Sequence, residues 1–165
     1  MNTVSMSASV TPKYKILVVD DDIDLNTTFA LLLEFDGHEV RTAYACEAAL
    51  LILEKIQFDL IIAEYWLPGM KGDELAALVK QKWPDQPIIL TAANIQQFQK
   101  EDHLFAGVDC LLNKPFTISQ LREAITWVLE RHTENQLGAL SPVARFSLQE
   151  KSEVTRKAPK YNRGP

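Results

Sequence analysis

Five polar residues that directly follow short apolar runs could together perform phosphate chemistry. They are Asp20, Asp21, Glu64, Thr91 and Lys114. The carboxylates suit a divalent cation such as Mg²⁺, because hard cations prefer oxygen ligands. The ammonium and the hydroxyl suit a phosphoryl group, which carries negative charge and strong acceptor oxygens. If the fold brings these residues together, the sequence predicts a site for Mg²⁺ and phosphate.

The apolar runs before these residues are typical of strands in a parallel sheet. Four runs, at 16–19, 60–63, 88–90 and 108–112, are mostly continuous, as expected for strands covered on both faces. A fifth run at 38–43 alternates, which suits an edge strand. A helical pattern follows each strand, weakest at 95–106 and clearest after Thr117 and Gln120, which form a possible capping box. The sequence therefore predicts five strand–helix units.

Strict alternation of strands and helices predicts parallel pairing through right-handed crossovers. Five units are too few to close an eight-stranded barrel, so we predict an open, doubly wound α/β sandwich. In such sheets the functional groups gather beyond the carboxyl ends of the strands. The predicted fold would place all five polar residues at one edge of the sheet.

Charge is distributed unevenly along the chain, whose formal net charge is −5. Residues 1–132 carry 11 Lys or Arg and 19 Asp or Glu, whereas residues 133–165 carry 6 and 3. We expect a flexible N-terminus at 1–13, one domain at 14–131 and a basic, disordered tail or linker at 132–165. Within this tail, residues 143–148 are either part of the solvated linker or a short docking piece. The acidic body argues against direct nucleic-acid binding.

Features of secreted and membrane proteins are missing from the sequence. No run of about 18 apolar residues could cross a membrane, and residues 1–13 lack the apolar core of a signal peptide. Cys46 and Cys110 lie far apart without metal-ligand spacing, so we expect reduced, packed thiols. These observations predict a cytoplasmic protein that does not bind membranes.

Four motifs in a fixed order resemble those of the receiver domain of two-component response regulators. They are Ile-Leu-Val-Val-Asp-Asp at 16–21, Leu-Pro-Gly-Met-Lys-Gly at 67–72, Ile-Ile-Leu-Thr-Ala at 88–92 and Lys-Pro-Phe at 114–116. The resemblance covers about residues 13–131. It implies a flavodoxin-like (βα)5 fold with strand order 2-1-3-4-5, a topology that chemotaxis receivers share.

The resemblance also implies roles for individual residues. Asp20 and Asp21 resemble the acidic pair that holds Mg²⁺, and the backbone carbonyl of Trp66 resembles the third protein ligand. Thr91 resembles the hydroxyl that signals phosphorylation, and Lys114 the ammonium that faces the phosphate. The implied metal site therefore consists of Asp20, Asp21, Glu64 and Trp66.

Glu64 stands where the family has its phosphate-accepting aspartate, four residues before Pro68. Phosphoryl transfer depends on placement, and a displacement of about 1 Å can cost two orders of magnitude in rate. Ordinary phosphorylation should therefore be lost or impaired. The longer side chain also brings a permanent carboxylate toward Lys114, so we expect partial mimicry of the phosphorylated state.

A second departure from the family lies three residues before Lys114, where the usual aromatic switch residue is replaced by Leu111. Leucine lacks the hydroxyl of tyrosine, so the usual coupling of ring movement to Thr91 is altered. Two tryptophans leave alternatives open: Trp66 is a core-edge anchor or a partner-facing ring, and Trp127 packs on the helix flank or belongs to a contact surface.

The resemblance implies a non-enzymatic pseudo-receiver that acts through protein contacts. Expected partners are a histidine kinase or a downstream effector, and a homodimer could form through 95–106, the fifth strand and the last helix. One alternative is an Mg²⁺-dependent phosphatase that uses Asp20 as nucleophile, since an Asp triplet after a strand also resembles the first motif of haloacid-dehalogenase-type enzymes. Another alternative is a conventional phosphorelay receiver that is still modified.

Overall fold

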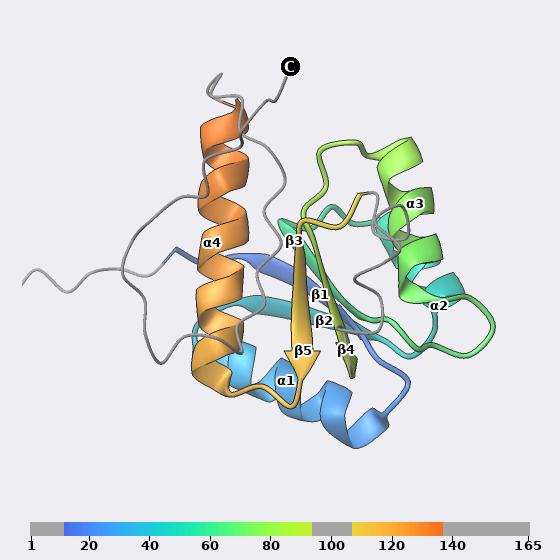
Figure 1. Cartoon of the computed structure of the whole chain (residues 1–165), viewed down its shortest axis with the longest axis horizontal. Helices are drawn as coiled ribbons and strands as arrows, with labels where there is room; N and C mark the ends of the chain where they lie inside the picture. The colour runs from blue at the N-terminus through green and yellow to red at the C-terminus, as the bar shows by residue number, and fades with distance from the viewer. Residues whose placement is uncertain (1–11, 94–106, 137–165) are drawn as a thin grey trace, which may run out of the picture.

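The computed structural model describes residues 12–93 and 107–136, which form a five-stranded sheet with helices on both faces (Figure 1). All neighbouring strands pair in parallel, in the order β2-β1-β3-β4-β5. The strands are β1 (Lys15–Val19), β2 (Glu39–Ala43), β3 (Leu60–Glu64), β4 (Ile88–Ala93) and β5 (Cys110–Lys114). The predicted fold class and strand order are confirmed.

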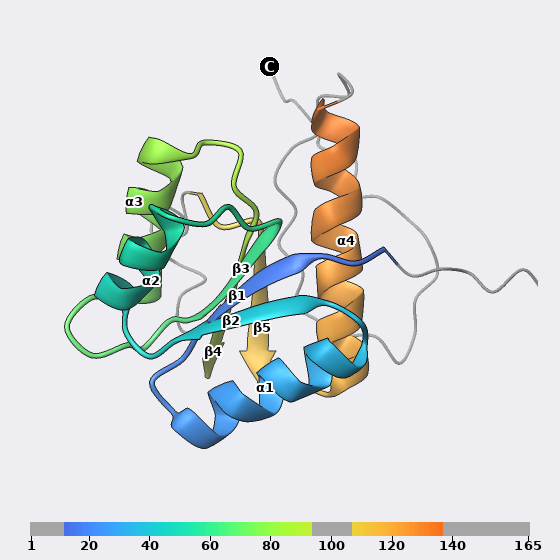
Figure 2. The ribbon, with the colours of Figure 1, turned by 180° about the vertical axis from the view of Figure 1, so that it is seen from behind.

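The helices form two layers, one on each face of the sheet (Figures 1 and 2). They are α1 (Ile23–Phe35), α2 (Cys46–Leu53), α3 (Gly72–Lys82) and α4 (Ile118–Gln136). Successive side chains of a strand point to opposite faces. Accordingly, Leu17 packs in the core beneath α2 and α3, whereas its neighbour Ile16 packs in the core beneath α1 and α4.

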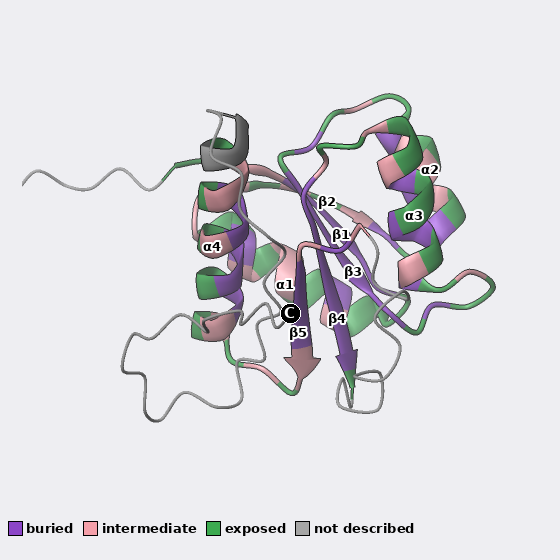
Figure 3. Ribbon diagram, turned by 45° about the horizontal axis from the view of Figure 1, so that its top comes forward, coloured by how far each residue is buried: buried purple, intermediate pink, exposed green. Residues whose placement is uncertain are grey.

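Burial follows the pattern expected from the sequence. Strands β1, β3, β4 and β5 are buried along most of their length, while the helices alternate buried and exposed residues (Figure 3). Strand β2 lies at the edge, with Glu39 and Arg41 exposed, as its alternating sequence predicted. In α4 the predicted capping box is present, because Gln120 accepts the Thr117 N–H at 2.7 Å and Thr117 Oγ1 accepts the Gln120 N–H at 3.2 Å.

Strand β5 starts two residues later than the apolar run at 108–112 suggested. Val108 is buried but precedes the strand. The next residue, Asp109, anchors the chain instead: its carboxylate accepts the backbone N–H of Ile88 at 2.8 Å and contacts Lys80 Nζ at 3.2 Å. Apolar character at this point therefore reflects burial in the core and not strand pairing.

Helix α4 continues to Gln136, whereas the apolar pattern ended near Arg131. The sequence at 132–136 contains no apolar residue, so the periodicity used in the prediction ends before the helix does. The helix expected at 95–106 and the terminal segments at 1–11 and 137–165 lie outside the described residues. Among the helices of the described part, none is long and apolar enough to span a membrane.

Candidate functional site

Four of the predicted residues meet at the carboxyl edge of the sheet. Asp20 follows β1, Glu64 ends β3, Thr91 lies within β4 and Lys114 ends β5. Parallel strands bring their carboxyl ends to the same edge, and the register of β3 and β4 places Glu64 directly opposite Thr91. Residues more than 90 positions apart in the sequence thus form one cluster.

The Glu64 carboxylate has partners at both of its oxygens. Oε2 accepts the Thr91 hydroxyl at 3.1 Å and is in direct contact with the Lys114 ammonium, and Oε1 accepts the Trp66 backbone N–H at 3.2 Å. Glu64 is 7% exposed and Thr91 1%. A carboxylate this buried requires such partners, because an unpaired buried charge is strongly unfavourable.

The Asp20 carboxylate shares the same ammonium. Its Oδ2 accepts a hydrogen bond from Lys114 Nζ at 3.0 Å, and its Oδ1 accepts the Asp22 backbone N–H at 3.0 Å. Asp20, Glu64 and Lys114 therefore form a compact group, here called the Lys114 ion cluster. With one cation between two carboxylates, the ionised cluster carries a net charge of −1.

The environment shifts two pKa values in the Lys114 ion cluster. Burial raises the pKa of the Asp20 carboxyl above its usual value of 3.8, although the Asp22 N–H and the Lys114 ammonium oppose this shift. Burial alone would lower the pKa of Lys114. The hydrogen bonds and charges of Glu64 and Asp20 outweigh burial, so the pKa of Lys114 lies above 10.5. Lys114 is therefore a permanent cation at neutral pH.

Of the other predicted site residues, Asp21 and Leu111 stand apart from the Lys114 ion cluster, whereas Trp66 contacts it through its backbone. Asp21 is exposed and makes no hydrogen bond or ion pair within the described ranges. The Trp66 backbone reaches the site through its N–H, while its side chain is 49% exposed. Leu111 is buried in the core beneath α2 and α3. In the described part of the chain, no three His, Cys, Asp or Glu side chains are arranged to hold a metal ion.

Local interactions hold the loop after β1 in place. Asp22 caps α1, because its Oδ1 accepts the N–H groups of Asp24 and Leu25, as expected for an acid before a helix. Asn26 is fully buried, and its Nδ2 donates to the carbonyls of Asp20 and Ala43, both at 2.8 Å. Asn26 was not predicted from the sequence; the available signal was a polar residue one turn into an apolar helical stripe.

The start of α3 approaches β3 so closely that only glycine fits at position 72. A Cβ on Gly72 would overlap the carbonyl oxygen of Glu64. The Gly72 N–H donates to the Tyr65 carbonyl at 2.9 Å and fixes this approach. This oxygen is the backbone carbonyl of Glu64. The close approach that glycine permits therefore helps to position the backbone from which the Glu64 side chain extends.

The two open alternatives for the tryptophans have different outcomes. The Trp66 ring lies edge-on to Tyr65, with centroids 4.8 Å apart, and Lys71 Nζ lies 5.2 Å from its centroid. The side chain is 49% exposed, and its proposed role toward a partner stays a prediction. Trp127 packs on the flank of α4 against the core, and Arg131 covers its ring at 4.7 Å.

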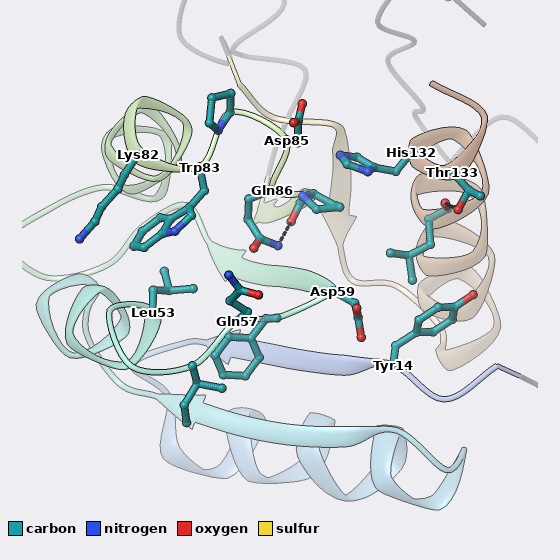
Figure 4. A pocket seen from close by; sticks show the side chains of 15 residues that line it. Tyr14, Leu53, Gln57, Asp59, Lys82, Trp83, Asp85, Gln86, His132 and Thr133 are labelled. Atoms are coloured by element: carbon teal, nitrogen blue, oxygen red, sulfur yellow. Dashed lines mark hydrogen bonds between the residues drawn. The ribbon is translucent and has the colours of Figure 1, made fainter. Parts of the chain in front are cut away.

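A separate pocket of about 580 Å³ lies at the amino edge of the sheet (Figure 4). Its walls come from the α2–β3 connection, the α3–β4 connection and the end of α4, with Tyr14 at its side. None of the predicted site residues lines it. It is here called the amino-edge pocket.

Comparisons with known proteins agree with the fold. The family model for the response regulator receiver domain matches residues 16–126. The response regulator protein FleR of Pseudomonas aeruginosa is 30% identical over 150 residues, covering 86% of this chain and 31% of FleR. The alkaline phosphatase synthesis transcriptional regulatory protein PhoP of Bacillus subtilis is 33% identical over 117 residues, covering 71% of this chain and 49% of PhoP. This chain thus matches a third to a half of the length of these relatives.

Solved structures are similar as well. A response regulator receiver domain protein from Clostridium thermocellum is 27% identical with a TM-score of 0.67, covering 73% of this chain and 98% of that one. The response regulator TrrA from Thermotoga maritima, solved in complex with Mg²⁺ and BeF, is 30% identical with a TM-score of 0.65, covering 72% of this chain and all of TrrA.

Proposed function

Because this chain belongs to the response regulator receiver domain family, we propose that it is a pseudo-receiver whose Glu64 replaces the phosphoacceptor aspartate and fixes a partly active-like state. The observation that carries this proposal is the position of Glu64 Oε2, which contacts both the Lys114 ammonium and the Thr91 hydroxyl. These are the two groups that the family motifs assign to the phosphoryl group. In this chain the Glu64 carboxylate contacts both the ammonium and the hydroxyl.

The contacts of Glu64 also account for the proposed loss of phosphorylation. In-line transfer requires a carboxylate oxygen that can approach the phosphorus atom with correct alignment. One oxygen of Glu64 is engaged by Lys114 and Thr91, and the other accepts the Trp66 N–H. Attack on a phosphodonor would require these contacts to break, in addition to the altered reach of the longer side chain.

The mimicry should be partial, because a carboxylate offers about one charge and two oxygens where a phosphoryl group offers up to two charges and three oxygens. Leu111 adds to this difference. It is buried among apolar residues and has no hydroxyl that could follow a movement of Thr91. We propose a fixed signal instead of a switch that is turned on and off.

Receiver domains typically bind Mg²⁺ at the phosphorylation site, and the oxygen donors here have suitable chemistry. We propose that Asp20, Asp21, Glu64 and the Trp66 carbonyl would hold such an ion after a rearrangement of side chains, because no three acidic side chains of the described residues are arranged for metal binding as they stand. The ion would supply positive charge beside the carboxylates. Asp20 and Glu64 already share the Lys114 ammonium. Binding should therefore be weak, since Mg²⁺ must compete with a cation that belongs to the chain.

Receiver domains are generally signalling modules without turnover, and response regulators interact with histidine kinases and effectors. We propose that residues 14–131 are such a signalling module without turnover, which interacts with a histidine kinase or an effector. Residues 132–165 serve largely as a basic tail or linker. A homodimer through residues 95–106, β5 and α4 is also part of this proposal, although 95–106 lies outside the described residues. No direct contact with nucleic acid is proposed, because the body of the chain is acidic.

The test is incubation of the full chain with Mg²⁺ and a small acyl phosphate, followed by intact mass spectrometry. We expect no phosphoryl adduct on the wild-type protein and a labile adduct on Glu64→Asp. The shorter side chain of aspartate places its carboxylate at the distance from the backbone that the family uses. Glu123→Asp is the matched control, since Glu123 is an exposed residue of α4 and its shortening should leave the protein unmodified.

An adduct on wild type that maps to Glu64 would contradict the proposal and favour the alternative of a receiver that is still modified. Turnover of a phosphate ester that disappears in Asp20→Asn would favour the phosphatase alternative. Failure of Glu64→Asp to accept phosphate, while wild type also stays unmodified, would mean that the rest of the site has lost competence as well.

A further inference from the structure

The amino-edge pocket lies at the opposite edge of the sheet from the Lys114 ion cluster, and the proposed function does not use it. Its volume of about 580 Å³ lies within the range of about 300–1,000 Å³ that is usual for binding pockets. Figure 4 shows side chains from separate connections and from α4 around the same hollow. The hollow is therefore large enough to receive a short peptide segment.

Apolar side chains form much of the pocket wall. Leu53 and Phe58 are buried core residues that reach it from the α2–β3 side, and Trp83 is half-buried on the α3–β4 side. Leu129 of α4 and Tyr14 also line it. Such a wall favours an occupant with an aromatic or branched apolar side chain, because burial of apolar area is the main source of affinity.

Charged groups around the pocket leave an excess of negative charge. Asp59 and Asp85 line it, and neither forms an ion pair with a residue of the described ranges. The one lysine of the lining, Lys82, is paired with Glu54 at 3.1 Å and lies 4.8 Å from the centroid of the Trp83 ring. The pocket therefore favours an apolar occupant that also carries positive charge.

The C-terminal part of the chain starts at the rim of this pocket. Leu129, His132 and Thr133 line it, and α4 continues to Gln136, about one helical turn further. Residues 137–165 carry six Lys or Arg and two Asp or Glu. Their first stretch rich in large apolar residues is Val-Ala-Arg-Phe-Ser-Leu at 143–148, which combines three such side chains with one arginine.

The connection is long enough for this stretch to reach the pocket. Seven steps separate Gln136 from Val143, which allows a span of up to about 25 Å at about 3.5 Å per residue. A tethered segment also binds at a high effective concentration, because its ends are joined by a short linker. Modest contacts are therefore sufficient.

We propose that the amino-edge pocket is a docking site for residues 143–148 of the same chain. Phe146 supplies the apolar group for the wall formed by Phe58 and Trp83, and Arg145 supplies the cation that Asp59 and Asp85 attract. This inference does not depend on the role of Glu64. It makes the basic tail a specific ligand of the domain in place of a wholly solvated linker.

Disulfide trapping in the full chain tests this docking. Cys46 and Cys110 are buried, and burial raises the pKa of these thiols to about 11 and about 12, so introduced thiols should react first. The test pair is Gln57→Cys with Ser147→Cys, since Gln57 is exposed and lines the pocket. The matched control pair is Thr27→Cys with Ser147→Cys, which places another exposed thiol on α1.

Under mild oxidation we expect the test pair to form an intrachain disulfide at least about tenfold faster than the control pair, because docking raises the effective concentration of the two thiols. Adding Phe146→Ser to the test pair should reduce the rate to that of the control. Equal rates for the two pairs, or a rate unaffected by Phe146→Ser, would overturn the proposal. Predominantly interchain disulfides would also overturn it, in favour of a second copy as the occupant.

Discussion

Replacing Lys114 with methionine should be far more damaging than replacing either acid of the Lys114 ion cluster. Methionine preserves the apolar stem of the side chain but removes the only cation of the cluster. Asp20 and Glu64 would then be two buried like charges, 3% and 7% exposed, with no ammonium between them. By contrast, Glu64→Gln leaves the pair of Lys114 and Asp20 intact at 3.0 Å.

The magnitudes follow from the burial of each partner. Removing one partner of a buried ion pair costs about 3–5 kcal/mol, and we expect about 3 kcal/mol for Lys114→Met, because the lysine side chain retains 24% exposure. For Glu64→Gln we expect about 1 kcal/mol, since the amide keeps partners at Thr91 and Trp66 and relieves the repulsion of Asp20. The double variant should cost less than the sum of the two single variants.

The cost of Lys114→Met should depend on pH. The pKa of Asp20 is raised in the folded wild-type protein, so the contribution of this group to stability falls as pH rises from 3.8 through its folded pKa. Lys114 opposes that rise in pKa, so its removal extends the window of falling stability toward neutral pH. The contribution of Lys114 itself is fully present below pH 10.5 and is lost only as pH rises through its folded pKa.

Urea denaturation followed by circular dichroism measures these free energies of unfolding, at about pH 7 and about pH 4.5. We expect the cost of Lys114→Met to shrink at the lower pH, because the Asp20 carboxyl, whose pKa is already raised by burial and is no longer lowered by Lys114, takes up a proton there. Lys82→Met is the matched control, because its pair with Glu54 is 56% exposed on both sides and should be worth less than about 1 kcal/mol at either pH. Equal costs for Glu64→Gln and Lys114→Met, or a cost of Lys114→Met that is the same at both pH values, would refute this account of the cluster.

Three further predictions concern the supports of the site and the thiols. Gly72→Ala should destabilise the protein by about 1–3 kcal/mol in urea titrations, because the new Cβ would overlap the Glu64 carbonyl oxygen; an unchanged midpoint would show that α3 can shift freely. Asn26→Ala should cost about 2 kcal/mol by the same measurement, since the Asp20 carbonyl loses the Asn26 donor and the Ala43 carbonyl keeps only the Asp20 N–H at 3.2 Å; a neutral effect would mean that water replaces the amide. Cys46 and Cys110 should resist a thiol reagent at neutral pH and react only after unfolding, because burial raises their pKa values to about 11 and about 12; rapid labelling of the native protein would contradict their burial.

Much of the candidate site could be predicted from residue types at the ends of apolar runs. Asp20, Glu64, Thr91 and Lys114 were all identified in this way, because a parallel sheet brings the carboxyl ends of its strands to one edge. The strand order came from the family motifs, since spacing alone does not decide which strands are neighbours. Hydrophobic periodicity did not predict where the helices and strands end. Helix α4 continues past its apolar stripe, and Val108 is buried without belonging to β5.

The sequence by itself determined the alternation of strands and helices, the acidic body with a basic tail, and the polar residues that end the apolar runs, among them Glu64. Only the tertiary structure decided how these residues are arranged. It showed that Lys114 lies between Asp20 and Glu64 and that Asp21 lies outside the Lys114 ion cluster. It also showed that Asn26 holds the loop after β1 and that Gly72 allows α3 to approach the end of β3. The physical reason is that side-chain partners are set by distances across strands, and residues as far apart as Asp20 and Lys114 acquire such distances only when the sheet is assembled.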